Sequence, residues 1–347
     1  MMHINFNAIV EAAWHAYDSS RAVRSITDIS AMVSTNHVFR LRLEDDTMVI
    51  AKVSYFGTYE DFVEDHSLIN ALANNLPEPF DNILSRSLLH KNELYTYRHQ
   101  DGLLDSWVVF YNPIRVAEKL PRVLSESQIN VLGSQLAHFH RACHRLRNIL
   151  PDWSKNLKGD MLRLLWHLDT EEGQFRHRGT VDQIRRQVDI FDNNMENLGA
   201  HSWDSTPVFV DWNIGNFSVT DETKLFSRWD YDWFRMSSRV LDFYFLSRVC
   251  STVGDRTVFS YLIDPIMEPR FLIFLKAYHA VYPLTRDEVL FMKEAYRFFI
   301  LNYVVKYGHY FFHEPYATKL QREAFELYFP NLETQFNPEP IFKALDL

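Results

Sequence analysis

The chain has 347 residues and a formal net charge of −9 at pH 7, so we do not expect a nucleic-acid partner, which would require a basic surface. Its composition is that of a soluble globular protein, with 47% hydrophobic and 23% charged residues. None of the 10 glycines forms a dinucleotide-binding turn or a Walker-type phosphate loop. The 2 cysteines lie too far apart in the sequence to suggest a zinc site or a disulfide framework, which fits a cytoplasmic location. We also expect no signal peptide and no membrane span, because no apolar stretch approaches the required ~20 residues.

Strand and helix patterns alternate in the first part of the chain. Residues 30–54 and 92–112 have the pattern of strands, and an acidic turn between 38–43 and 47–53 predicts a hairpin. Between them, residues 59–72 carry apolar side chains at helical spacing. These patterns predict a small α+β domain over residues 1–112.

Long helical patterns dominate after Pro113. The apolar spacing predicts helices over residues 125–145, 181–198, 289–307 and 320–329. They are interrupted by short strand-like runs within residues 206–230. Residues 113–347 are therefore predicted to form a mostly helical domain with a small β insert. Most aromatic residues within 242–329 are expected in its core, and a few could line an acceptor pocket.

A polar loop between two apolar runs carries the most informative residues. Asp211, Gly215 and Asn216 lie within six positions of one another. Asp230 follows Asp211 by 19 positions, and Asp242 follows Asp230 by 12. An earlier helical segment contains Leu-Ala-His-Phe-His at residues 136–140.

These residues, in this order, resemble the aminoglycoside phosphotransferase and choline kinase family of small-molecule kinases. The family pattern is His-Gly-Asp-x-x-x-x-Asn, then Ile-Asp-Trp/Phe-Asp/Glu, then Asp-Leu-Ala. The resemblance covers roughly residues 30–250 and is strongest in 205–245. It implies a protein-kinase-like fold of two lobes, with residues 1–112 as a β-rich nucleotide-binding lobe and 113–347 as a helical lobe with the catalytic loop and the acceptor site.

The resemblance also implies roles for three residues of the helical lobe. Asp211 would accept or orient the proton of the attacking alcohol, while Asn216 and Asp230 would supply oxygen ligands to Mg²⁺. Asp232 would join a second metal ion if residues 230–232 were extended, since its side chain would then lie on the same face as that of Asp230. The implied cofactors are ATP and Mg²⁺.

In the first lobe, Lys52 lies within an apolar strand, on the face shared with Met48 and Ile50. By resemblance it would hold the α- and β-phosphates and pair with an acid of the following helix. A 100° helical wheel places Asp65 in the middle of the apolar face and Glu64 about 100° away, so we prefer Asp65 and keep Glu64 as second choice. Residues 34–38 would cover the phosphates, and backbone groups near 109–111 would contact adenine.

The chain departs from the family pattern next to the catalytic loop. Phe209 stands where the family has histidine, and Val210 where it has glycine. The missing histidine removes a contact that helps to hold the loop. Asp242 is interpreted as an N-cap or loop-bracing acid, and His138 and His140 as packing or loop-bracing residues.

The sequence therefore predicts an ATP-dependent phosphotransferase that acts on a hydroxyl group of a small molecule such as an aminoglycoside, choline or another amino alcohol. Three alternatives remain open. The chain could be a pseudokinase that binds a nucleotide without turnover, a Ser/Thr protein kinase of the same fold, or a helical scaffold that binds no nucleotide. Neither the acceptor nor the oligomeric state follows from the sequence.

Overall fold

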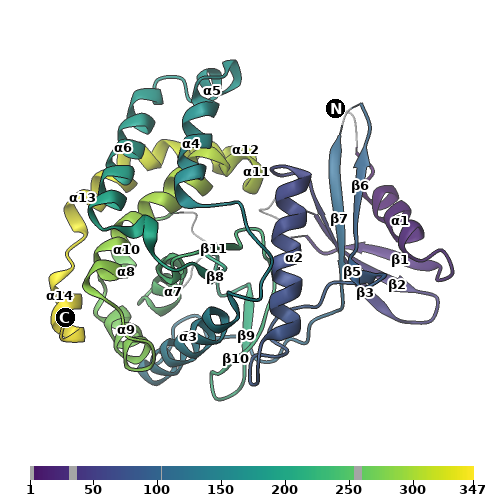
Figure 1. The fold of residues 1–347 in the computed structure, drawn as a ribbon, viewed down its shortest axis with the longest axis horizontal. Helices are drawn as coiled ribbons and strands as arrows, with labels where there is room; N and C mark the ends of the chain where they lie inside the picture. The colour runs from purple at the N-terminus through teal and green to yellow at the C-terminus, as the bar shows by residue number, and fades with distance from the viewer. Residues whose placement is uncertain (1–3, 31–36, 103, 254–259) are drawn as a thin grey trace. The chain divides into compact units, whose positions relative to one another are not determined.

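The computed structural model of the protein describes residues 4–30, 37–102, 104–253 and 260–347. Two compact units are present, one formed by residues 1–115 with 310–313 and the other by 116–309 with 314–347. The first is built around an antiparallel sheet and the second is mostly helical (Figure 1), which confirms the predicted kinase-like α+β fold class. Within the described residues, no helix is both long and apolar enough to span a bilayer.

The first unit is organised by a five-stranded sheet with the strand order β1-β2-β3-β7-β6. All neighbouring strands are antiparallel, and the predicted hairpin is confirmed as the β2–β3 pair. The strands are β1 (Val23–Asp28), β2 (His37–Leu43), β3 (Met48–Ser54), β6 (Thr96–Gln100) and β7 (Asp105–Tyr111). Two short strands, β4 (Leu89–His90) and β5 (Glu93–Leu94), pair separately. The register places Lys52 between Val38 and Val109 in the middle of the sheet.

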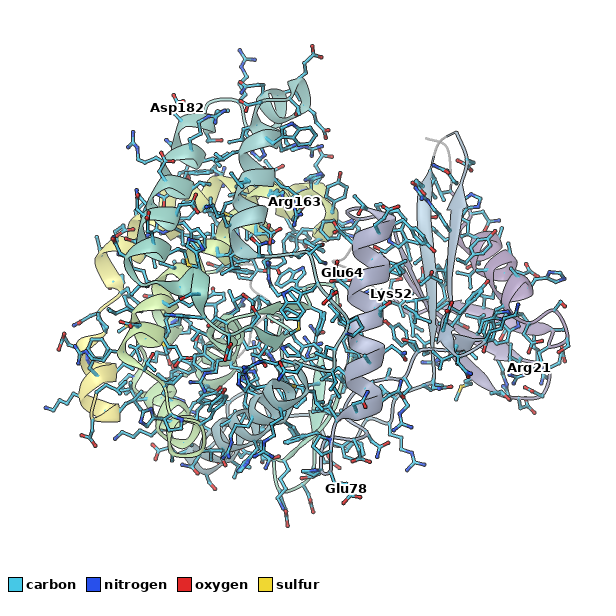
Figure 2. All side chains as sticks on the ribbon, viewed as in Figure 1. Arg21, Lys52, Glu64, Glu78, Arg163 and Asp182 are labelled. Atoms are coloured by element: carbon cyan, nitrogen blue, oxygen red, sulfur yellow. The ribbon has the colours of Figure 1, made fainter. Side chains whose placement is uncertain are left out.

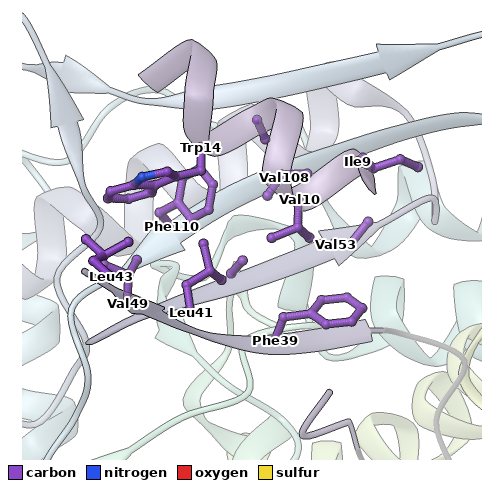
Figure 3. Close-up of a cluster of buried hydrophobic side chains, with 12 residues drawn as sticks. Ile9, Val10, Trp14, Phe39, Leu41, Leu43, Val49, Val53, Val108 and Phe110 are labelled. Atoms are coloured by element: carbon purple, nitrogen blue, oxygen red, sulfur yellow. The ribbon is translucent and has the colours of Figure 1, made fainter. Parts of the chain in front are cut away.

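Helix α1 (Phe6–Tyr17) covers one face of this sheet and completes its apolar core (Figure 3). Its buried side chains, among them Val10 and Trp14, pack against strand residues such as Leu41 and Phe110. The Asn5 side chain caps the helix by accepting a hydrogen bond from the backbone N–H of Ala8 at 3.2 Å. We did not predict this helix, although its apolar residues recur at helical spacing.

Helix α2 (Tyr59–Asn75) covers the opposite face (Figure 1) and confirms the predicted helix. The Phe62 ring centroid lies 5.9 Å from that of Trp107, and the Tyr111 hydroxyl is hydrogen-bonded to Nδ1 of His66. Because side chains alternate along β7, Val108 and Phe110 face α1 while Trp107, Val109 and Tyr111 face α2. Lys52 is paired with Val109 and so lies on the α2 side of the sheet.

Two helices of the second unit pack closely against each other. Helix α3 (Glu126–Leu146) begins at a capping box of Ser125 and Gln128 and packs against α9 (Pro269–Val281). The close approach requires glycine at position 133, because a Cβ there would lie 2.4 Å from the carbonyl oxygen of Phe274. The remaining helices before α9 are α4 (Leu157–Leu168), α5 (Glu171–Arg176), α6 (Val181–Asn197), α7 (Phe243–Cys250) and α8 (Asp264–Met267).

The C-terminal helices are less regular than their sequence pattern predicts. The predicted helix 289–307 is α10 (Arg286–Phe299) followed by a π-helical stretch, Ile300–Lys306. The predicted helix 320–329 spans the end of α12 (Glu314–Glu323), a π-helical stretch and the start of α13 (Phe329–Gln335). A π turn adds a residue without ending the helix, so apolar spacing alone does not reveal it. Two short helices, α11 (Gly308–Phe311) and α14 (Glu339–Leu345), also lie in the C-terminal part of the chain; α11 ends in residues that belong to the first unit.

The predicted β insert consists of two small antiparallel pairs. Strand β8 (Thr206–Val208) pairs with β11 (Arg235–Ser237), and β9 (Phe217–Val219) pairs with β10 (Leu225–Arg228). Strand β8 ends at Val208, so only the first residue of the strand-like run at 208–210 lies in a strand; Val210 has φ +60° and leaves the extended conformation. The two loops that join these pairs carry Asp211, Asn216 and Asp230.

Candidate active site

The loop that carries Asp211 begins with an unusual turn at Val210. The backbone N–H of Asp211 donates to the carbonyl of Phe209 at 2.6 Å, across a residue with φ +60°. This geometry is a γ-turn, which is rare and strained, and it is especially unfavourable for a β-branched residue. Valine thus adopts the backbone conformation that favours glycine, the residue of the family pattern, and surrounding contacts must hold it there.

Asp242 provides the first of these contacts. Its Oδ1 accepts hydrogen bonds from the N–H groups of Phe209 (2.9 Å) and Val210 (2.6 Å), and its Oδ2 lies 3.0 Å from Nε2 of His140. Nδ1 of His140 lies 2.8 Å from the Tyr278 hydroxyl. The predicted loop-bracing roles of Asp242 and His140 are confirmed.

His138, in contrast, is exposed on α3 and neither packs nor braces the loop. Two positions along a helix correspond to about 200° of rotation, so His138 and His140 lie on nearly opposite sides of α3. Our prediction of a packing or bracing role for His138 is therefore wrong.

Asp211 and Asn216 are in direct contact. Nδ2 of Asn216 donates to Oδ2 of Asp211 at 3.0 Å and to its carbonyl oxygen at 3.3 Å. The backbone N–H of Asn213 donates to Oδ1 of the same carboxylate at 3.3 Å. The Asn216 carboxamide therefore contacts Asp211 through its nitrogen, whereas its oxygen is the atom that would bind a cation.

The segment around Asp230 is a turn, which overturns one of our expectations. Asp230 has φ +66°, and the N–H of Phe234 donates to the carbonyl of Tyr231 at 3.0 Å. Residues 230–232 are therefore not extended, and the argument that Asp232 shares a face with Asp230 fails. The N–H of Trp229 donates to the carbonyl of Asn216 at 2.9 Å, which brings the Asp230 turn beside the Asp211 loop.

Arg228 is the important residue that we did not identify from the sequence. It is completely buried, and its guanidinium donates to the carbonyl oxygens of Asp211 (3.0 Å) and Asp230 (2.6 Å). Burial lowers the pKa of the guanidinium, and the charges of Asp211 and Asp242 oppose that shift. The available signal was an arginine at the end of a short apolar strand, where a charged side chain requires a partner.

The first unit contains the residues predicted to bind the nucleotide. Lys52 is only 6% exposed and lies on the α2 side of the sheet, where Figure 2 labels it. On α2, Asp65 lies about 60° from the sheet-facing Phe62, whereas Glu64 lies about 160° from it. The helix geometry is consistent with our preference for Asp65, and its pairing with Lys52 stays a prediction.

Two further expectations concern the phosphates and adenine. Residues 34–36 of the expected phosphate loop lie outside the described residues. The carbonyl of Phe110 accepts from the N–H of Leu88 at 2.8 Å, and Asn112 donates its N–H to the carbonyl of Arg86 at 2.9 Å. The expected adenine contact of residues 109–111 stays a prediction.

Comparison with known proteins identifies the fold. No protein-family model matches the sequence, and no curated protein matches it in sequence. Among solved structures, an amicoumacin kinase in complex with AMP-PNP and Ca²⁺ is similar with a TM-score of 0.62 at 12% identity, covering 97% of this chain and 100% of that one. A microcompartment-associated aminopropanol kinase has a TM-score of 0.57 at 15% identity, covering 92% and 94%. A gentamicin complex of APH(2")-IIa has a TM-score of 0.57 at 13% identity, covering 98% and 99%. The chain therefore has the fold of small-molecule phosphotransferases, and the resemblance seen in the sequence is confirmed at the level of the fold.

Proposed function

We propose that this protein is a phosphotransferase that moves the γ-phosphoryl group of ATP to a hydroxyl group of a small molecule. The observation that carries the proposal is the arrangement of the Asp211 and Asp230 loops in a chain of this fold. Asn216 contacts the Asp211 carboxylate through its side chain at 3.0 Å and the Asp230 turn through its backbone at 2.9 Å. One residue thus joins the proposed base to the proposed metal-binding turn.

Asp211 is the proposed catalytic residue. Phosphoryl transfer needs a hydroxyl that is aligned with the phosphorus and a group that takes its proton. The Asp211 carboxylate is held by Asn213 and Asn216 and is partly exposed, so its position is defined while an alcohol can still reach it. A carboxylate in this situation can orient the hydroxyl and accept its proton as the bond to phosphorus forms.

Asn216 and Asp230 are the proposed magnesium ligands. A carboxamide oxygen and a carboxylate are hard donors, which suits Mg²⁺, an ion that usually takes one or two protein ligands and completes its shell with water and phosphate oxygens. The described residues contain no cluster of three or more His, Cys, Asp or Glu side chains that could hold a metal by themselves, consistent with such a sparse site. The bound ion would screen the charge of the phosphate oxygens.

Lys52 is the proposed phosphate-binding residue of the first unit. Its ammonium is buried in a sheet, where a charge needs compensation, and we propose that Asp65 of α2 supplies it. A lysine oriented in this way can bind the α- and β-phosphates of ATP. Glu64 is the second choice for this pairing.

We propose an amino-bearing alcohol as the acceptor. Two solved structures of this fold are an aminopropanol kinase and a gentamicin complex, and both names denote compounds with amino and hydroxyl groups. A protein with a net charge of −9 would also attract such cationic molecules.

A nucleotide-binding protein without turnover is the second candidate, and Phe209 favours it because the family has histidine there. Against it, the loop is held by Asp242 on one side and by Arg228 on the other. The missing histidine therefore does not leave the loop unsupported.

Consumption of ATP in the presence of Mg²⁺, measured over amino alcohols, aminoglycosides, sugars and protein substrates, tests the proposal. We expect turnover with at least one amino-bearing alcohol and a loss of about 10³-fold in kcat for Asp211→Ala, with nucleotide affinity nearly unchanged. Asp230→Ala should weaken Mg-nucleotide binding itself. Asp221→Ala, in the exposed turn between β9 and β10, is the matched control.

The outcomes separate the candidates. A thermal shift with Mg-ATP but no consumption with any acceptor would favour binding without turnover. Full activity of Asp211→Ala would remove Asp211 as the base. Turnover with a protein substrate alone would favour a protein kinase, and the absence of any nucleotide effect would favour a scaffold.

A further inference from the structure

Arg228 occupies a position that needs a specific explanation. It ends strand β10, opposite Phe217, and its side chain is 0% exposed. A buried guanidinium loses its hydration, which is strongly unfavourable unless polar partners replace the water. In the described part of the chain its hydrogen-bond partners are backbone carbonyls, and its Nε donates to none of them.

These carbonyls belong to the two loops of the candidate active site. One terminal nitrogen donates to Asp230 (2.6 Å) and Trp229 (3.1 Å), and the other donates to Asp211 (3.0 Å) and, at 3.5 Å, to Phe209. A planar guanidinium has its donors in a fixed fork, so it holds the two loops in one relative arrangement. Lysine, with a single flexible ammonium, could hold only one of them well.

The aromatic surroundings fix the plane of this fork. The guanidinium carbon lies 4.3 Å from the ring centroid of Phe209 and 5.1 Å from that of Trp212. Phe209, which stands where the family pattern has a histidine, therefore contributes a ring face that stabilises the buried cation. Phe209, which departs from the family pattern, and Arg228 therefore pack directly against each other.

Both loops contain a residue with a positive φ, which is strained for the β-branched Val210 and tolerated by Asp230. Val210 and Asp230 have φ values of +60° and +66°. Asp242 binds the N–H groups on one side of the Val210 turn, and Arg228 binds the carbonyls of the flanking residues on the other. Arg228 also holds the Asp230 turn, because its guanidinium donates to the backbone carbonyl of Asp230.

We propose that Arg228 is a positioning residue that links the proposed base, Asp211, to the proposed metal ligand, Asp230, through their backbone carbonyls. This inference rests on the proposed phosphotransferase function. It assigns Arg228 an effect on the rate of transfer and on metal activation, in addition to its contribution to folding.

The test compares Arg228→Met and Arg228→Lys with Arg297→Met. Arg297 is the matched control, because it is also 0% exposed in the second unit but binds Glu294 and Glu333 and, within the described residues, forms no hydrogen bond or ion pair with either loop. For Arg228→Met we expect kcat to fall about 100-fold per folded molecule, since displaced reacting groups lose about this much, and KM for the nucleotide to stay within about 3-fold. The Mg²⁺ concentration for half-maximal activity should rise about 10-fold, and Arg228→Lys should recover part of kcat.

A second readout does not depend on turnover. Hydrogen exchange of peptides covering 207–216 and 226–234 should accelerate at least about 10-fold in both segments for Arg228→Met and stay unchanged there for Arg297→Met. If the wild-type protein transfers no phosphate, the proposed function fails, while the exchange data still decide whether Arg228 holds the two loops.

Three results would overturn the inference. One is a folded Arg228→Met protein whose kcat lies within about 3-fold of wild type. Another is an equal loss of kcat in Arg297→Met, which would mean that the effect is only destabilisation. The third is unchanged exchange in both segments. If Arg228→Met does not fold, the test is made with Arg228→Lys instead. That variant must then show a lower kcat than wild type with an unchanged KM for the nucleotide.

Discussion

Replacing Asp242 by alanine removes the acceptor that holds the turn before Asp211. The carboxylate binds the N–H groups of Phe209 at 2.9 Å and Val210 at 2.6 Å, and its other oxygen lies 3.0 Å from Nε2 of His140. Asp242 and its three partners are all buried, with at most 1% exposed surface. Water cannot replace the lost acceptor without a rearrangement of the loop.

The magnitude follows from the groups that are left without a partner. Each buried N–H that loses its acceptor costs about 1–3 kcal/mol, so the two N–H groups predict a loss of about 2–6 kcal/mol in the free energy of unfolding for Asp242→Ala. Asp242→Asn keeps an oxygen for these N–H groups and can donate its amide to His140. It loses only the charge-assisted part of the bonds, about 1 kcal/mol.

Urea unfolding followed by far-UV circular dichroism, in the transition of the mostly helical unit, measures both variants. We expect the order wild type, Asn, Ala, with similar dependence on urea concentration. Phosphoryl transfer per folded molecule should follow the same order, because the turn orients Asp211. An alanine variant within about 1 kcal/mol of wild type, or an asparagine variant as unstable as alanine, would refute the reasoning.

Three further predictions concern packing, pH and the nucleotide. Gly133→Ala should lower the free energy of unfolding by about 1–3 kcal/mol, because its Cβ would lie 2.4 Å from the Phe274 carbonyl oxygen. Gly102→Ala is the control, since a Cβ there would have no atom within 4 Å, and it should have little effect in the same urea titration. Burial, reinforced by His167 and Arg176, lowers the pKa of His177 to about 4, so the unfolded state binds a proton that the folded state does not as the pH falls from 6.5 to 4. The stabilisation that neutral His177 provides is therefore complete above pH 6.5 and falls by up to about 3 kcal/mol toward pH 4. When the free energy of unfolding is measured at several pH values, it should decline less steeply with falling pH for His177→Gln than for wild type. An identical decline in both proteins would contradict the role assigned to His177. Lys52→Met should reduce the affinity for Mg-ATP at least about 10-fold in a calorimetric titration without unfolding the sheet, and unchanged affinity would remove Lys52 from the nucleotide site.

Local patterns were sufficient for much of the fold. The alternation around the acidic turn predicted the β2–β3 hairpin, and apolar spacing predicted α2, α3 and α6. These features depend on residues close together in the chain, so a single sequence contains the information. Helix α1 has the same spacing and could have been predicted; the π-helical stretches after α10 and α12 could not, because they preserve an apolar face.

The order and spacing of polar residues were likewise sufficient to select Asp211, Asn216 and Asp230 as candidates. The sequence did not reveal how their loops are held. Asp242 reaches Phe209 over 33 positions and Arg228 reaches Asp211 over 17, and both contacts hold the turn at Val210, whose positive φ is not expected of a β-branched residue.

By itself, then, the sequence identified the candidate residues for phosphoryl transfer and many of the strands and helices, because both follow from residue type and short-range spacing. Only the tertiary structure decided that the Asp230 segment is a turn and that a buried arginine joins it to the Asp211 loop. The physical reason is that a strained turn and a buried charge persist only where distant parts of the chain supply their hydrogen-bond partners.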